Sequence, residues 1–150
     1  MCRCGNRGCL ETLASGRAIV ERAVECLQKG VDSSIPDAGD GHLEKITPEV
    51  VAEAARKGDK LANNIMNETR ERLEIGIANL VNLFNPELVV IGGGLSGASD
   101  LLMNPVRQAV KARGLQIATD ALRIEVSELG QKAGVSGAVT LIIDNRIFET

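Results

Sequence analysis

Aromatic side chains are almost absent from this chain of 150 residues, which contains two phenylalanines but neither tryptophan nor tyrosine. Its core must therefore be built from leucine, isoleucine, valine and alanine, a composition that favours helix-rich α/β packing over a β-sandwich. An excess of basic residues is also missing, because 17 Lys and Arg stand against 20 Asp and Glu and give a net charge of -3. This balance gives no reason to expect that the segment itself binds nucleic acid.

Long apolar runs are missing as well. The longest ones are far shorter than the roughly 20 residues that a membrane-spanning helix needs, so we expect no membrane span. No hydrophobic leader precedes the cysteines, and Cys2 and Cys4 are too close together to form a useful disulfide. We therefore expect metal binding in a reducing, cytoplasmic environment rather than a secreted disulfide scaffold.

Three cysteines do stand together near the N-terminus, at Cys2, Cys4 and Cys9, with glycines between them. Glycine permits the tight turns that bring thiolates onto one soft cation, and Zn²⁺ is the usual one. A structural zinc site needs four ligands, so we expect the fourth to come from upstream. Two residues of the chain are weaker alternatives: His42 is solitary in a polar loop, and Cys26 is typical of a core thiol. We call residues 1–11 the knuckle.

Apolar spacing and end signals divide the rest of the chain into helices and strands. We expect helices over residues 12–29, 48–57, 60–84, 99–113 and 133–148, strands over 87–91 and 122–129, and a polar loop over 31–46. The helix over 60–84 is apolar nearly all round from Leu73 onward, which predicts burial. The first strand is continuously apolar, which predicts burial on both faces. Two strands make a poor sheet, so we expect partner strands upstream.

Two further features have competing interpretations. From its spacing alone, Glu11 is better explained as a helix N-terminal acid than as a carboxylate that accepts hydrogen bonds from a polyol. Gly92, Gly93 and Gly94 follow a buried strand, where α/β sheets bind ligands, but a tight turn explains them equally well. No catalytic Ser/His/Asp or Cys/His set can be assigned.

Taken together, these features resemble the ROK family of bacterial repressors, open reading frames and sugar kinases. The matching segments are residues 2–11, residues 79–87 with 90–94, and residues 129–130 with 133–135. The resemblance spans essentially the whole chain. It implies a single domain over residues 1–150 that forms the C-terminal part of an actin-like ATPase domain of the ribonuclease H-like class.

The resemblance also implies roles for individual residues. Cys2, Cys4 and Cys9 are similar to the family's three zinc thiolates, whose fourth ligand is a histidine further upstream. Glu11 is similar to the sugar-contacting glutamate, which reverses the interpretation from spacing. The triplet from Gly92 to Gly94 is similar to the loop that lies against the adenosine of ATP. The catalytic aspartate and the phosphate motif of the family would lie upstream, so we expect no catalysis by these residues alone.

Two functions remain open at this stage. The runs over residues 79–86 and 142–148 look more like repressors, in which a winged helix-turn-helix precedes a sugar-sensing body. The intact glycine triplet is similar to the kinase branch, in which Mg-ATP binds. We favour the sugar-sensing effector domain of a transcriptional regulator and keep the C-terminal lobe of an ATP-dependent, glucokinase-like hexose kinase as the alternative.

Both functions imply a small-molecule sugar as partner, and DNA contact only through a further N-terminal domain. The long apolar helix also predicts a homodimer or higher assembly, because its missing sheet would leave apolar surface exposed. The polar loop over 31–46 has no pattern that names the sugar.

Overall fold

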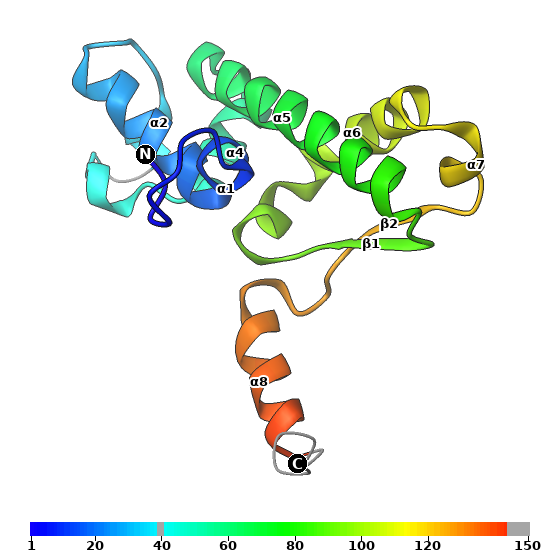
Figure 1. The fold of residues 1–150 in the computed structure, drawn as a ribbon. Coiled ribbons are helices and arrows are strands. Elements are labelled where there is room, and N and C mark those ends of the chain that lie inside the picture. Colours follow the sequence, from blue (N-terminus) through cyan, green and yellow to red (C-terminus); the bar gives the residue numbers. More distant parts are fainter. Residues whose placement is uncertain (39–40, 144–150) are drawn as a thin grey trace.

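The structure, a computed structural model, describes residues 1–38 and 41–143. Helices make up most of it, and two short parallel strands lie beneath the longest helix (Figure 1). The arrangement is helix-rich α/β, as the composition predicts. The expected end of the last helix at Phe148 lies outside the described residues.

In the N-terminal half, the described residues form helical elements and no strand. They are α1 (Leu10–Leu13), α2 (Gly16–Gln28), α3 (Ile35–Ala38), the 3-10 turn η1 (Leu43–Lys45), α4 (Pro48–Arg56) and α5 (Lys60–Phe84). The predicted starts of α4 and α5 are confirmed. The polar loop over 31–46 is not wholly irregular, because it contains α3 and η1.

Side-chain caps explain where these helices begin. Ser15, Thr47 and Asp59 each accept a hydrogen bond from the backbone N–H three residues further on, at 3.1, 3.3 and 2.8 Å. The cap at Ser15 corrects the single helix expected over residues 12–29. Its backbone is extended, with φ -120° and ψ 166°, so the chain ends α1 and starts α2 as a separate helix.

The C-terminal half alternates strands with helices. Its elements are β1 (Leu88–Ile91), η2 (Gly93–Ala98), α6 (Ser99–Arg113), α7 (Gln116–Thr119), β2 (Arg123–Val126), η3 (Gly130–Lys132) and α8 (Ala133–Ile143). The strands pair in parallel, from Leu88 opposite Arg123 to Ile91 opposite Val126. Helix α6 supplies most of the crossover that a parallel pair requires. The second strand is shorter than predicted.

Helix α5 is the centre of the core and packs against both α4 and α6. Ile65 of α5 is buried together with Val51 of α4 and Leu102 of α6. Val89 and Ile91 of β1 pack against the same cluster. The core therefore carries β1 in a fixed position, and the loop that follows β1 starts from a rigid support.

The burial predicted for the end of α5 and for both faces of β1 is wrong. Leu83 and Phe84 are 74% and 68% exposed, and Leu88 and Val90 are 44% and 55% exposed. Alternate residues of a strand point to opposite faces, and only one face of β1 rests on the core. Nothing among the described residues covers the other face.

Helix α8 projects away from the rest of the molecule (Figure 1). Its large exposed apolar side chains are Val135, Val139, Leu141, Ile142 and Ile143. Within residues 1–38 and 41–143, no helix is both long and apolar enough to cross a membrane.

Candidate functional site

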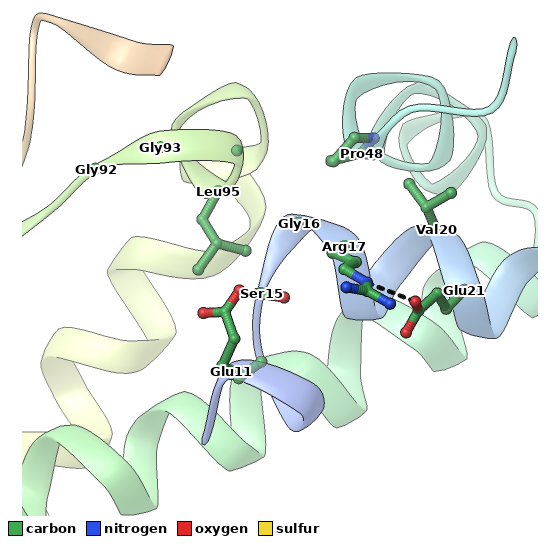
Figure 2. Close-up of a pocket in the computed structure, with 12 residues that line it drawn as sticks. Glu11, Ser15, Gly16, Arg17, Val20, Glu21, Pro48, Gly92, Gly93 and Leu95 are labelled. Atoms are coloured by element: carbon green, nitrogen blue, oxygen red, sulfur yellow. Dashed lines mark hydrogen bonds and ion pairs between the residues drawn. The ribbon is translucent and has the colours of Figure 1, made fainter. Parts of the chain in front are cut away.

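A cavity of about 650 Å³ opens between the N-terminal helices and the end of β1 (Figure 2). Its walls come from the junction of α1 and α2, from Pro48 at the start of α4, and from the loop after β1. Glu11 lines it, as do Gly92, Gly93 and Gly94. The structure therefore brings together two predicted features that lie far apart in the sequence.

Short helix α1 holds Glu11 at the cavity. The Thr12 hydroxyl donates to the Cys9 carbonyl at 2.8 Å, so α1 continues directly from the knuckle. Leu10 sits against Gly76 of α5, where an added Cβ would lie only 2.9 Å from Leu10 Cδ2. The knuckle and α5 together fix the turn that carries the carboxylate.

The charged groups that line the cavity are two carboxylates and one guanidinium. Arg17 and Glu21 pair with each other at 2.5 Å, one helical turn apart on α2. Within the described part of the chain, Glu11 has no hydrogen-bond or ion-pair partner. An ionised carboxylate only accepts hydrogen bonds, so Glu11 offers its oxygens to a ligand that carries hydroxyl groups.

The glycine side of the cavity presents backbone instead of side chains. Gly93 has φ +73°, a left-handed conformation that favours glycine. The Ser96 hydroxyl donates to the Gly93 carbonyl at 2.7 Å and closes the turn. A ligand can therefore approach main-chain groups closely at the carboxyl end of β1, the usual place for ligands in α/β sheets.

Sequence reasoning missed the other residues that line the cavity, among them Arg17, Glu21 and Pro48. Proline at the first helical position predicts a helix start, but nothing local indicates that α4 begins beside the glycine loop. Arg17 and Glu21 are four residues apart and share a helix face. With Glu11 known as a candidate, that spacing is the signal that could have found them.

Ser33 and Ser34 of the polar loop are held by Asp59, and none of these three residues lines the cavity. Asp59 accepts from the Ser33 hydroxyl at 3.0 Å and from the Ser34 N–H at 2.7 Å, besides capping α5. Burial alone would raise the pKa of Asp59, but hydrogen bonds from the N–H groups of Ala62 and Ser34 and from both serine hydroxyls outweigh it and lower the pKa.

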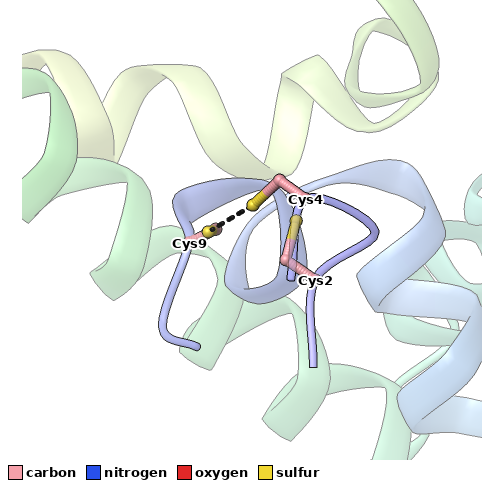
Figure 3. Close-up of side chains that lie close together, drawn as sticks. All are labelled: Cys2, Cys4 and Cys9. Carbon is pink, nitrogen blue, oxygen red and sulfur yellow. Dashed lines mark hydrogen bonds between the residues drawn. The ribbon is translucent and has the colours of Figure 1, made fainter. Parts of the chain in front are cut away.

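In the knuckle, the three thiols converge (Figure 3). Gly5 and Gly8 have φ of +85° and +73°, and the Cys2 N–H donates to the Asn6 carbonyl at 2.9 Å, which closes the loop. The three sulfur atoms lie within 4.8 Å of one another, and the Sγ atoms of Cys4 and Cys9 are 3.5 Å apart.

This geometry fits tetrahedral zinc. A Zn–S bond of about 2.3 Å separates two thiolate ligands by about 3.8 Å, close to the spacing found here. Among the described residues no further His, Cys or carboxylate joins the group. His42 pairs instead with Glu44 at 3.1 Å, and Cys26 is half-buried against the core, as a structural thiol would be.

Hydrogen bonds within the knuckle divide the thiols by acidity. The Asn6 backbone N–H, followed by the thiols of Cys2 and Cys9, lowers the pKa of Cys4 to about 7. Hydrogen bonds to Cys4 and Cys2 raise the pKa of Cys9 to about 11. Cys4 is therefore the first of these two thiols to ionise, and its thiolate is stabilised by its neighbours.

The site combines a parallel strand pair joined by a helical crossover, a glycine loop at the end of the first strand and a cavity beside that loop. The chain is a helix-rich α/β piece that matches part of the actin-like ATPase fold of sugar kinase structures. It belongs to the ROK family, whose model matches residues 1–145. The family resemblance of the sequence is confirmed.

Curated relatives include both regulators and kinases. The chain is 34% identical over 147 residues to the xylose repressor of Caldicellulosiruptor bescii, a match that covers 98% of this chain and 36% of the repressor. It is 37% identical over 141 residues to the glucokinase of Halalkalibacterium halodurans, covering 94% of this chain and 42% of that enzyme. The chain thus spans less than half the length of either relative, and the two classes match it about equally.

A solved structure of a ROK family kinase has the same fold over most of this chain. The fold matches a ROK family glucokinase from Streptomyces griseus, in complex with glucose and AMPPNP, with 32% identity and a TM-score of 0.74. The match covers 92% of this chain and 45% of that chain.

Proposed function

We propose that this chain forms the sugar-sensing effector part of a ROK-family transcriptional regulator and that Glu11 contacts the sugar. The observation that carries the proposal is the position of Glu11, whose carboxylate has no partner in the described chain and lines a cavity of about 650 Å³. Cavities of this size are typical of small-molecule sites. A carboxylate accepts hydrogen bonds from neighbouring sugar hydroxyls, and such charge-assisted bonds are strong.

Regulation follows from differential binding. A sugar that contacts Glu11 favours whichever arrangement of the surrounding lobes completes its contacts and so shifts their equilibrium. DNA contact is made, in this proposal, by a domain outside these residues, since the chain covers 36% of the xylose repressor. The similarity to that repressor over 98% of this chain supports the proposal.

The three cysteines of the knuckle are the proposed ligands of a structural Zn²⁺ ion. The ion would cross-link the turn that leads into α1 and so hold Glu11 in place. A site closed by protein ligands keeps no open position for chemistry. We place the protein in the cytoplasm, where such thiols stay reduced.

A sugar kinase is the second candidate. The left-handed Gly93 and the side-chain-free backbone from Gly92 to Gly94 favour it, because ATP requires close approach of the main chain. In that function the loop contacts Mg-ATP, and residues outside this chain supply the catalytic base. The similarity to glucokinases supports this candidate as strongly as the repressor supports the first.

Calorimetric titration separates the two. The zinc-loaded chain is titrated with xylose and glucose, with glycerol as a polyol control, and then with AMPPNP in the presence and absence of sugar. A regulator predicts that one sugar binds and AMPPNP does not. If AMPPNP binds, and binds more tightly with sugar, the result supports the kinase proposal and contradicts the regulator proposal. The absence of sugar binding would contradict both proposals.

A further inference from the structure

The start of α2 touches the glycine loop without any side chain between them. A Cβ atom added to Gly16 would lie 3.1 Å from Gly94 Cα, 3.2 Å from Gly94 C and 3.0 Å from Pro48 Cγ. These spacings are tighter than about nine in ten of the Cβ contacts found in proteins. The three residues all line the cavity, so their contact lies at the edge of the candidate binding site.

Backbone conformation does not explain the glycine at position 16. Gly16 is the first residue of α2 and does not have the left-handed φ that favours glycine. Glycine is a poor residue in a helix, because it loses more conformational freedom than alanine on folding. The close approach of Gly94 is the remaining structural reason for its presence.

Helix α4 also holds the C-terminal end of η2, the turn that continues from the glycine triplet. Arg56 Nε and Nη2 donate to the two carboxylate oxygens of Asp100 at 2.8 and 2.6 Å, and Nη2 also lies 3.4 Å from the Gly97 carbonyl. Pro48 stands at the first residue of α4 and Arg56 at its last. Helix α4 therefore lies beside the glycine triplet through its first residue and beside the end of η2 through its last.

The loop between these anchors is packed rather than free. Leu95 is 8% exposed and Ala98 is fully buried. A Cβ atom at Gly16 therefore requires the loop, Pro48 or the start of α2 to shift by a few tenths of an ångström.

We propose that Gly16 is a positioning residue that sets the separation between the Glu11 side and the glycine side of the cavity. The start of α2 and the loop from Gly92 to Gly94 form one unit, braced by α4, and a side chain at position 16 displaces the loop. That the cavity takes a sugar rests on the proposed function, whereas the mechanical contact does not.

Hydrogen exchange tests the contact without a ligand. In Gly16→Ala, amides of residues 93–98 should exchange about tenfold faster than in the unaltered chain, while amides in the middle of α5 should keep their protection. Gly137→Ala on α8, where an added Cβ meets nothing within 4 Å, is the matched control and should leave the loop unchanged. Loop exchange within about twofold of the unaltered chain would overturn the proposal.

A second variant covers the case in which Gly16→Ala fails to fold. A Cβ on Gly94 would lie 3.4 Å from Gly16 Cα, so Gly94→Ala should disturb the same contact more mildly. It should speed loop exchange by a few-fold, and unchanged exchange would again overturn the proposal.

Sugar titration of Gly16→Ala adds the functional arm. If the unaltered chain binds a sugar, its affinity should fall about fivefold or more, as expected for a displaced site wall. An unchanged affinity would show that the contact does not position the site. If the unaltered chain binds no sugar, the proposed function fails, and the exchange experiment still decides whether Gly16 positions the loop.

Discussion

The guanidinium of Arg56 and the carboxylate of Asp100 form a two-pronged ion pair, with hydrogen bonds of 2.8 and 2.6 Å, between the end of α4 and the first turn of α6. Such fork-shaped pairs fix orientation as well as charge. The pair ties the start of α6, which directly follows η2, to α4, the helix whose first residue lies beside the cavity. It joins the fold to the candidate site.

This pair makes stability depend on pH. Its hydrogen bonds hold the pKa of Asp100 below its usual range. A carboxylate with a lowered pKa in the folded state stabilises the fold above its unfolded pKa and loses that contribution as pH falls through its folded pKa. We expect the free energy of unfolding to fall from about pH 5 toward pH 2. The fall should be shallower in Asp100→Asn, measured by urea unfolding, and identical slopes would show that the pair contributes nothing.

The contact of Leu10 with Gly76 predicts that a larger residue at position 76 would clash with the Leu10 side chain. Alanine in a helix interior usually stabilises by about 0.5–1 kcal/mol relative to glycine. In Gly76→Ala that gain should be cancelled, because the new Cβ would lie 2.9 Å from Leu10 Cδ2. In a Leu10→Ala background the gain should reappear in urea unfolding. Equal gains in both backgrounds would mean that Leu10 does not rest on Gly76.

Metal removal should loosen the knuckle. A bound Zn²⁺ ion stabilises the state that binds it, so chelation should lower the melting temperature of the zinc-loaded chain. Cys4→Ser should bind zinc more weakly and lose most of this effect. Cys26→Ser is the matched control, because Cys26 is packed against the core and is not part of the thiol group. Equal zinc affinity in both variants would contradict the assignment of the ligands.

Exposed apolar side chains predict self-association. Leu88 and Val90 on the open face of β1 are 44% and 55% exposed. Sedimentation velocity at micromolar concentration should show a dimer or larger species, and Val90→Lys should shift it toward monomer. Val31→Lys alters a valine with 44% exposure in the polar loop and should not. A monomer in the unaltered chain would refute this prediction.

Local sequence signals predict the ends of helices well where a single residue sets the end. Pro48 after Thr47 gives the start of α4, and Asn85, in a left-handed conformation with φ 46°, ends α5 just before Pro86. Ser15 carried an equally local signal that the apolar spacing of α2 concealed. The helix was therefore predicted as continuous, although a serine hydroxyl was available to cap a new one.

Exposure could not be predicted from local sequence, because it depends on which elements cover a surface. Val90 has the character of a buried strand residue and is exposed because no described element lies on that face. The residues that line the cavity could not be predicted fully for the same reason. Glu11 and the glycine triplet were both identified, but Arg17 and Pro48 join them only through the packing of α2 and α4 against the loop.

The most direct test of the account is the sugar affinity of Glu11→Gln, measured by calorimetry beside Glu25→Gln. Glu25 pairs with Lys29 on the surface of α2 and does not line the cavity, so it controls for the loss of one carboxylate. The account predicts that Glu11→Gln weakens binding roughly 10- to 100-fold, the cost of charge-assisted hydrogen bonds, while Glu25→Gln binds normally. Equal affinity in the two variants would contradict the assignment of Glu11 as the sugar-contacting carboxylate.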